Sequence, residues 1–167
     1  MKYCQLTTTK HSLSKRFPEH LVKINTIILE ETLQENLNKI NQPFNEEVAL
    51  KLDKVKESSE DDESVKDLKS MDIVLGMNHG GSYKMLLADF KLNCFSTKSL
   101  KPNDCRNKIR CSKIILFGGG IPIHNTYLFI FNNEYLSKSE ARHDISRKLN
   151  NLPVEVLSIT ELHKKYF

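Results

Sequence analysis

Apolar residues recur along this chain at two spacings, and the spacing predicts where helices and strands lie. The segment 18–41 carries apolar residues three and four positions apart, which predicts a long helix, and 45–56 predicts a second, shorter one. Two apolar runs, 72–77 and 84–94, flank the turn Asn-His-Gly-Gly-Ser and predict a hairpin. Residues 1–17 are polar, and we expect only an arm or a short edge element there.

The second half of the chain predicts a further mixture of helices and strands. The expected helices begin near Pro102, cover 139–150 and begin again at Thr160, and the expected strands cover 114–117, 126–131 and 154–159. Helices and strands follow one another without regular alternation, which argues against a doubly wound nucleotide-binding fold. We therefore expect one domain over residues 1–167, of mixed α/β (α+β) class, with a central mixed β-sheet flanked by helices.

Charged residues interrupt the second strand of the predicted hairpin. Asp89 and Lys91 are two positions apart, so they share one face of the strand, and both faces are otherwise mostly apolar. A buried carboxylate and a buried ammonium both need partners, because leaving either unpaired is costly. One interpretation is a structural ion pair, in which the two residues neutralise each other or meet charges on a neighbouring element.

The other interpretation is a metal site. Asp72 opens the first strand, and the geometry of an antiparallel hairpin lets its carboxylate approach Asp89. Two carboxylates supply the hard oxygen ligands that Mg²⁺ prefers, and a nearby lysine can orient a water or stabilise charge on a phosphate. Glu31 and Glu35 continue an apolar stripe of the helix predicted at 18–41, so that helix offers a third acid. The combination suits hydrolysis of a phosphodiester.

The stretch "MDIVLG…YKMLLADFKLN" resembles the signature of the PD-(D/E)XK nuclease superfamily, which includes restriction endonucleases and Holliday-junction resolvases. The resemblance implies a restriction-endonuclease-like fold and Mg²⁺ or Mn²⁺ as cofactor. It implies as catalytic residues Asp72, Asp89, Lys91 and Glu31, and as metal ligands Asp72, Asp89, Glu31 and Glu35. The chain departs from the family in two places. Met71 stands where the family often has proline, and no strand is predicted between the glutamate helix and Asp72.

Two segments of opposite charge bear on partners. The net charge of the chain is +4. The segment 98–113 contains six basic residues and one acidic residue, and its basic residues could follow a phosphate backbone or form a solvated helix face. These candidate nucleic-acid-binding residues are Lys98, Lys101, Arg106, Lys108, Arg110 and Lys113. The acidic stretch 57–67 predicts a flexible connector over 57–70, or else a mimic of nucleic-acid charge that covers a basic site.

A metal-dependent nuclease is the function we expect, with nucleic acid as its partner. The alternatives are a non-enzymatic protein-binding regulator of immunity or antitoxin type, with 57–67 as its interaction surface, and a degenerate nuclease fold that only binds nucleic acid. Whether the chain is an enzyme stays open between them. No apolar run is long enough to span a membrane and the N-terminus has no apolar signal core, so we expect a cytoplasmic protein.

Overall fold

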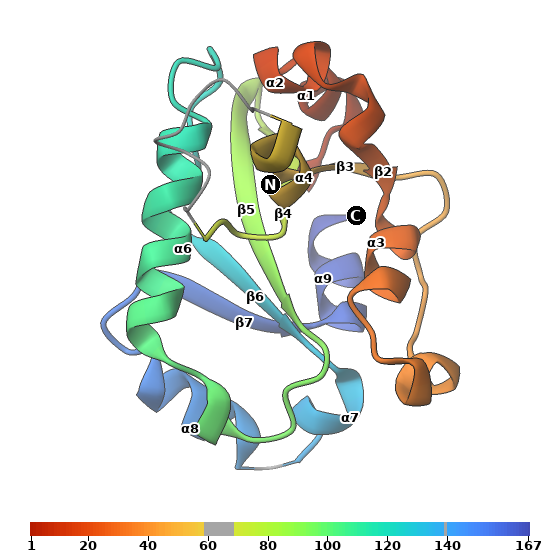
Figure 1. Cartoon of the computed structure of the whole chain (residues 1–167), viewed down its shortest axis with the longest axis vertical. Coiled ribbons are helices and arrows are strands. Elements are labelled where there is room, and N and C mark those ends of the chain that lie inside the picture. Colours follow the sequence, from red (N-terminus) through yellow and green to blue (C-terminus); the bar gives the residue numbers. More distant parts are fainter. Residues whose placement is uncertain (59–68, 139) are drawn as a thin grey trace.

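The structure is a computed structural model that describes residues 1–58, 69–138 and 140–167. A seven-stranded mixed sheet forms its centre, in the order β2-β3-β4-β5-β6-β7, with β1 paired to β4 beside this path (Figure 1). The strands are β1 Lys2–Tyr3, β2 Leu21–Lys23, β3 Val48–Lys51, β4 Ile73–His79, β5 Ser82–Lys91, β6 Tyr127–Phe131 and β7 Val154–Ser158. The mixed α/β class expected from the sequence is confirmed.

Helices cover both faces of this sheet. The α-helices are α1 Gln5–Lys10, α2 Ser12–Arg16, α3 Ile24–Glu30, α4 Leu52–Ser58, α6 Pro102–Ile115, α7 Asn133–Leu136, α8 Ala141–Lys148 and α9 Ile159–Tyr166. Short 3₁₀ turns are η1 Pro18–His20, η2 Gln34–Lys39 and η3 Thr97–Ser99. Figure 1 shows α6 on one side of the sheet and α3 and α9 on the other. Within the described ranges, no helix has the length and apolar character needed to cross a bilayer.

Strand β5 lies where the two halves of the sheet meet. It pairs antiparallel with β4 through the predicted hairpin and parallel with β6, because α6 carries the chain back before β6 begins. Its side chains alternate between two cores. Met85 and Leu87 belong to the core under α6, whereas Leu86 and Ala88 belong to the core under α3 and α9. The strand is thus covered on both faces, as its apolar pattern predicts.

The predicted helix over 18–41 is wrong, because tertiary pairing divides this segment. Leu21–Lys23 form a strand that pairs with β3, and only Ile24–Glu30 are α-helical. The prediction of a helix over 45–56 is also wrong in its first part. Val48–Lys51 pair with β2 and β4, and the helix α4 begins only at Leu52. A short apolar run is compatible with the periodicity of a helix and with that of a strand, so pairing with neighbouring strands decides which of the two forms. One consequence is a strand between α3 and Asp72, where the sequence predicts none.

The predicted strand over 114–117 is wrong too, since these residues end α6. Leu116 is the C-cap of that helix, and Gly118 follows with a positive φ of 80°, a conformation that suits glycine at a helix end. By contrast, the strands β6 and β7 and the helices α8 and α9 form where the sequence predicts them. Ser158, rather than Thr160, caps α9, in a capping box with Glu161.

The first residues form more structure than the expected arm. Strand β1 pairs with β4, and α1 packs so closely on that strand that a side chain at Gly76 would overlap the backbone of Thr7 and Thr8. The Gly76 backbone N–H donates to Thr8 Oγ1 at 2.8 Å. Of the connector predicted at 57–70, residues 59–68 lie outside the described part of the chain. The described ends are the last residues of α4 and the residues from Lys69 onward.

Candidate active site

Asp72 and Asp89 lie side by side on the hairpin. Asp72 immediately precedes β4, where the register pairs Ile73 with Ala88 and so brings the start of β4 beside the end of β5. The Asp72 Oδ2 atom accepts a hydrogen bond of 2.6 Å from the backbone N–H of Phe90. Asp89 is completely buried. The hairpin therefore brings the two carboxylates together, as the metal interpretation requires.

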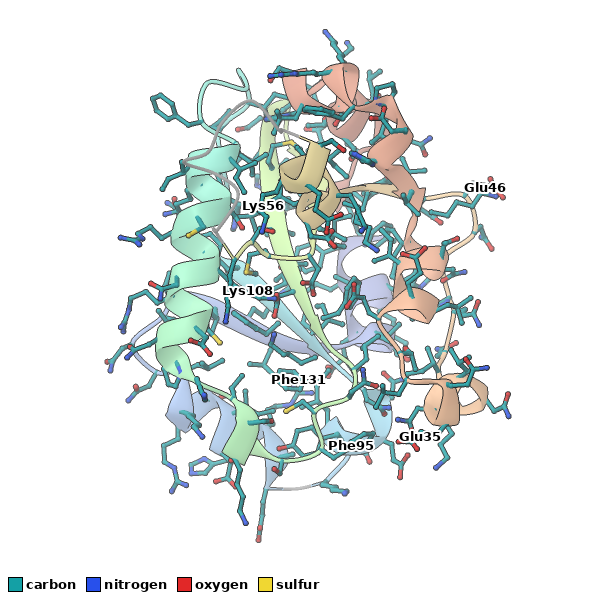
Figure 2. All side chains as sticks on the ribbon, in the orientation of Figure 1. Glu35, Glu46, Lys56, Phe95, Lys108 and Phe131 are labelled. Carbon is teal, nitrogen blue, oxygen red and sulfur yellow. The ribbon has the colours of Figure 1, made fainter. Side chains whose placement is uncertain are left out.

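Lys108 lies between these two carboxylates. Its Nζ atom is 3.2 Å from Asp72 Oδ1 and also donates a hydrogen bond to Asp89 Oδ1. The side chain reaches them from the middle of α6 toward the sheet (Figure 2). The Ser112 hydroxyl holds the helix at this point, because it donates to Lys108 O and accepts from the backbone N–H of Met71 at 2.7 Å. The structure thus places an ammonium between the two acids.

Lys91 is the second cation of the group. Its Nζ forms an ion pair with Asp89 Oδ2, and it lies 5.9 Å from the centre of the Phe129 ring. Among the described residues, none forms a hydrogen bond to Asp89 Oδ2, so this oxygen meets Lys91 as an ion pair. The ion pair that the sequence allowed is therefore present. Asp89 also meets a charge on a neighbouring element, because Lys108 comes from α6.

Burial changes the protonation behaviour of Asp72. It raises the pKa of Asp72 to about 7, and the charge of Asp89 adds to this effect while Lys108 opposes it. Burial alone would lower the pKa of Lys108, but the two carboxylates outweigh burial and raise that pKa above its ordinary value. Lys108 is therefore a permanent cation. The fully ionised acid pair is costly, so the site would gain from additional positive charge.

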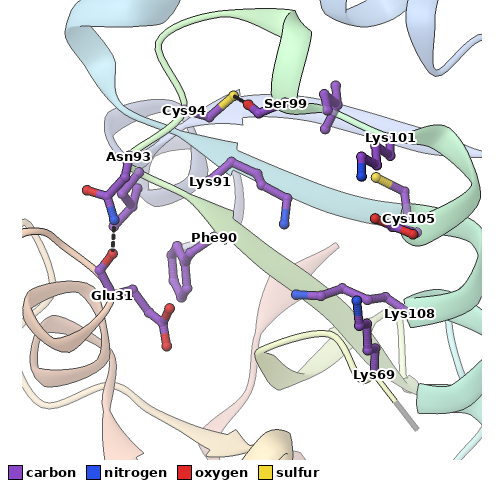
Figure 3. Close-up of a pocket in the computed structure, with 13 residues that line it drawn as sticks. Glu31, Lys69, Phe90, Lys91, Asn93, Cys94, Ser99, Lys101, Cys105 and Lys108 are labelled. Carbon is purple, nitrogen blue, oxygen red and sulfur yellow. Dashed lines mark hydrogen bonds between the residues drawn. The ribbon is translucent and has the colours of Figure 1, made fainter.

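Glu31 faces the same region, but Glu35 does not. Glu31 follows the last residue of α3 and lines a cavity of about 360 Å³ together with Lys91 and Lys108 (Figure 3). Burial raises the pKa of its carboxyl group. The Asn93 side chain holds this position, because it donates to Glu31 O at 2.9 Å and accepts from the backbone N–H of Leu33 at 3.0 Å. Glu35 is exposed on η2 and is not part of the cavity wall (Figure 2).

The six predicted phosphate-binding residues separate into different environments. Lys108 contacts the acid pair, which the sequence analysis did not predict. Lys101 lines the cavity near Cys105, whereas Lys69 lies beside Lys108 (Figure 3). The other four side chains are exposed on η3 and α6, and they are Lys98, Arg106, Arg110 and Lys113. The helical spacing carried a signal for Lys108, since it lies among the buried positions Cys105, Ile109 and Ser112 of α6.

A further charged pair that the sequence analysis did not single out lies next to Glu31. The buried Lys51 ammonium contacts the carboxylate of Glu30 at 2.5 Å. Nearby, Asp53 Oδ1 is buried, and none of the described residues hydrogen-bonds to it. Lys51 ends β3, and because the sequence placed this residue on a helix, its position beside the candidate site could not be foreseen.

The acid pair suits a hard divalent cation. Among the described residues, no group of three or more His, Cys, Asp or Glu side chains is arranged to hold a metal. Mg²⁺, however, commonly binds through one or two carboxylates and completes its shell with water and phosphate oxygens. Asp72 and Asp89 supply that minimal set, and they already enclose one positive charge, the Lys108 ammonium.

Comparisons with known proteins add no relative to this picture. No protein-family model matches the chain, and searches of curated proteins and of solved structures find no significant match. The function is therefore inferred from the residues themselves.

Proposed function

We propose that this chain is a small metal-dependent nuclease of the PD-(D/E)XK type, which hydrolyses phosphodiester bonds of nucleic acid. One observation carries the proposal. Asp72, which directly precedes β4, and Asp89 on the adjacent strand β5 converge on a single cation position, and Lys91 lies on the same strand face as Asp89. Carboxylates from two strands next to a lysine form the minimal equipment for metal-assisted attack on a phosphate.

The surrounding fold supports the proposal at two further points. Strand β3 supplies the strand between α3 and Asp72 that the sequence comparison with the superfamily lacked. Glu31, at the end of α3, lines the cavity into which Lys91 and Lys108 also project (Figure 3). Met71 remains a departure from the superfamily pattern; it is fully buried in the core under α6.

Each residue of the group has a role in the proposed reaction. Asp72 and Asp89 would hold Mg²⁺ or Mn²⁺, which supplies positive charge for the phosphate and lowers the pKa of a bound water. The Lys91 ammonium orients the attacking water or holds a phosphoryl oxygen, and Lys69 and Lys101 hold the substrate's phosphates at the cavity rim. Lys108 gives up its position between the acids and becomes available to the substrate.

A nuclease-like fold that binds nucleic acid without cutting it is the second candidate, and Lys108 is the observation that favours it. An ammonium that permanently fills the cation position would, together with Lys91, neutralise the acid pair and leave no room for a metal. Such a site is a structural ion cluster, and the basic residues of α6 would then account for any affinity for nucleic acid.

Cleavage assays test the proposal. We expect the protein to cut single-stranded DNA, plasmid DNA or RNA with Mg²⁺ or Mn²⁺, and we expect chelation to stop the reaction. Asp89→Asn and Lys91→Ala should each lower the rate at least about 100-fold, the size typical of losing one charge-stabilising group. The matched control is Lys39→Ala, which removes an exposed ammonium that does not line the cavity and should leave the rate unchanged.

Three outcomes would decide against the proposal. Cleavage that survives Lys91→Ala would show that other residues carry the chemistry. Folded protein that binds nucleic acid but never cuts it, with any metal, would favour the degenerate fold. Protein that neither binds nor cuts nucleic acid would favour the regulator that acts through another protein.

A further inference from the structure

The glycine loop Gly118–Gly120, which follows α6, separates two cavities at the end of the molecule away from η3. One has a volume of about 560 Å³ and the other about 450 Å³, and Gly119, Gly120, Ile121 and Pro122 line both. We call the residues around them the loop surface: Leu6, Lys10, Lys15, Tyr83, Lys113 and Phe117. Neither the acid pair nor its cavity shares a residue with this surface.

Apolar side chains are unusually exposed on the loop surface. Phe117 is 90% exposed, Leu6 57% and Tyr83 49%, and Ile114 next to them on α6 is 51% exposed. Single exposed apolar residues need no explanation, but a cluster around a hollow is typical of a binding site. An almost fully exposed phenylalanine contributes nothing to the core, so its ring is available to a partner.

The charge of the loop surface is positive. Lys10 and Lys15 line the larger cavity, and Lys113 lines the smaller one, with its Nζ 5.1 Å from the centre of the buried Tyr127 ring. Among the described residues, no aspartate or glutamate lines either cavity. The exposed Arg106 and Arg110 continue this positive charge along α6. Arg110 lies four positions after Arg106 and three before Lys113, so the three side chains share one face of the helix.

His11 packs against the glycine loop that directly follows Phe117. This histidine is fully buried, and a side chain at Gly119 would overlap its imidazole ring. His11 Nδ1 accepts a hydrogen bond of 3.3 Å from the backbone N–H of Leu13, whereas no described residue is a partner for Nε2. Glycine at 119 is therefore required for this close packing. The packing fixes the position of the loop backbone next to the exposed Phe117.

We infer that the loop surface binds an unpaired, single-stranded stretch of nucleic acid, with a base stacked on Phe117 and phosphates held by Lys10, Lys15 and Lys113. Exposed aromatic rings beside lysines, without acids, are the recognition elements of single strands, because a base offers its face for stacking only when it is unpaired. An acidic protein segment would find the cations but would leave Phe117 without a planar partner.

This inference deepens the proposed function, because it names the class of substrate, and it rests on that function for the identity of the ligand. Phe117 follows Lys108 by nine positions, which corresponds to about 14 Å along α6. At about 3.4 Å of rise per nucleotide, this axial distance equals about four nucleotides. Nine helical positions also turn Phe117 to the opposite side of α6 from the inward-facing Lys108, so a strand that contacts both sites must pass around the helix and be longer than that.

Binding without cleavage tests the inference. The affinity of the full chain for a fluorescein-labelled single strand of roughly 20 nucleotides, and for the matching duplex, is measured by fluorescence anisotropy in EDTA. We expect the single strand to bind more tightly, Phe117→Ala to weaken its binding about tenfold, and Phe117→Trp to retain it, because base stacking on an aromatic ring is worth roughly 1–3 kcal/mol. Leu33→Ala, which shortens an exposed apolar side chain elsewhere, is the matched control and should bind as the parent does.

The double variant Lys10→Ala with Lys15→Ala should lower the salt dependence of binding by about 1 to 2 phosphate contacts.

The inference is overturned by any of three results: Phe117→Ala binds the single strand as tightly as the parent, the parent binds neither strand form, or poly-glutamate competes as well as the single strand does. Circular dichroism and thermal melting confirm that each variant is folded, as expected for an exposed position. Cleavage is scored separately with Mn²⁺. Binding that depends on Phe117 without any cleavage contradicts the proposed nuclease activity but supports the proposed role of the loop surface. Cleavage together with binding that does not depend on Phe117 supports the nuclease activity and contradicts the role of the loop surface.

Discussion

At the scale of single residues, the chain buries two carboxylates against each other and neutralises them with lysines. Asp89 on β5 is completely buried and Asp72 is partly exposed, and Lys108 and Lys91 together offset their charge. Burying two carboxylates side by side is costly to the fold, and groups whose pKa is shifted in this way are concentrated at binding and catalytic sites. Two predictions follow from the protonation and the geometry of this pair.

Asp72→Asn is expected to stabilise the protein above neutral pH. The folded-state pKa of Asp72, about 7, is higher than the ordinary value of 3.8, so the folded chain keeps a proton that the unfolded chain has lost. The stability that this proton contributes is fully present below about pH 3.8 and is lost as pH rises through about 7. Asparagine keeps an acceptor for the Phe90 N–H but carries no charge. We expect a gain of roughly 1 to 3 kcal/mol at alkaline pH that shrinks steadily toward pH 4, measured by urea denaturation. A loss of stability at alkaline pH would mean that the ionised Asp72 is a net favourable partner of Lys108, and Asp104→Asn, at an exposed carboxylate, serves as the control.

Lys108→Met is expected to bind Mn²⁺ more tightly than the parent protein does. Methionine fills a similar volume but leaves the position between the two carboxylates free, so the metal no longer has to displace an ammonium. We expect at least about a tenfold increase in affinity by titration calorimetry. We also expect a loss of roughly 3 kcal/mol of stability in EDTA, because Lys91 alone then offsets the charge of the two carboxylates. Lys101→Met, at the cavity rim, is the control. Unchanged affinity would show that Lys108 and a metal do not compete for one place.

At the scale of elements, the end of α3 is what brings Glu31 toward the acid pair. The apolar stripe predicts that the helix continues, but α3 ends at Glu30. Asn93, two residues after β5, binds the backbone of Glu31 and Leu33 directly after the end of the helix. The Thr32 hydroxyl also donates to Ile28 O at 2.6 Å, a bond that competes with continued helix. A contact between segments far apart in sequence therefore sets where this helix ends.

Asn93→Ala is expected to weaken the attachment of the segment that follows α3. It removes two hydrogen bonds at an exposed position, so we expect a loss of about 1 kcal/mol in the free energy of unfolding, and faster hydrogen exchange at the Leu33 amide. Asn93→Asp keeps the acceptor for Leu33 and loses the donor to Glu31, and it should therefore lie between the parent and the alanine variant. If both variants exchange at the parent's rate, the segment that follows α3 is held by packing alone.

At the scale of the whole molecule, the candidate site lies where the antiparallel and parallel halves of the sheet join. Strand β5 belongs to both halves, and α6 connects them while it delivers Lys108 to the acid pair. Because the hairpin, α3 and α6 all contribute to this region, binding at the acid pair is coupled to the stability of the entire fold.

Mn²⁺ is accordingly expected to raise the melting temperature, and to do so more strongly at higher pH. The metal competes with the proton on Asp72, whose pKa is about 7, so the metal's stabilising effect should be small at pH 5.5 and near its maximum at pH 8.5. Differential scanning fluorimetry with Mn²⁺ or EDTA across this range measures the effect. Asp89→Asn should abolish it, and a shift of equal size at every pH would contradict a role for Asp72 as a ligand.

The local pattern of the sequence was sufficient for the hairpin and for its charges. Strand alternation placed Asp89 and Lys91 on one face, and the glycine turn, whose Gly80 and Gly81 have φ values of 55° and 85°, brought Asp72 toward them. Strands β6 and β7 and the helices α8 and α9 were likewise predictable, because their apolar periods are clear and turn residues bound them. These features depend on contacts between neighbours in the chain, which is the information that a sequence pattern carries.

The tertiary structure decided the parts that depend on partners from elsewhere in the chain. Whether Val48–Lys51 is helix or strand was settled by pairing with β2 and β4, and the length of α3 by Asn93. It also decided what Lys108 does. In the sequence this residue is one of six similar cations, but the packing of α6 on the sheet turns it inward to the two carboxylates. The sequence by itself determined that two acids and a lysine would share a hairpin. Only the fold decided which cation stands between the acids, because that depends on the direction in which a separate helix packs.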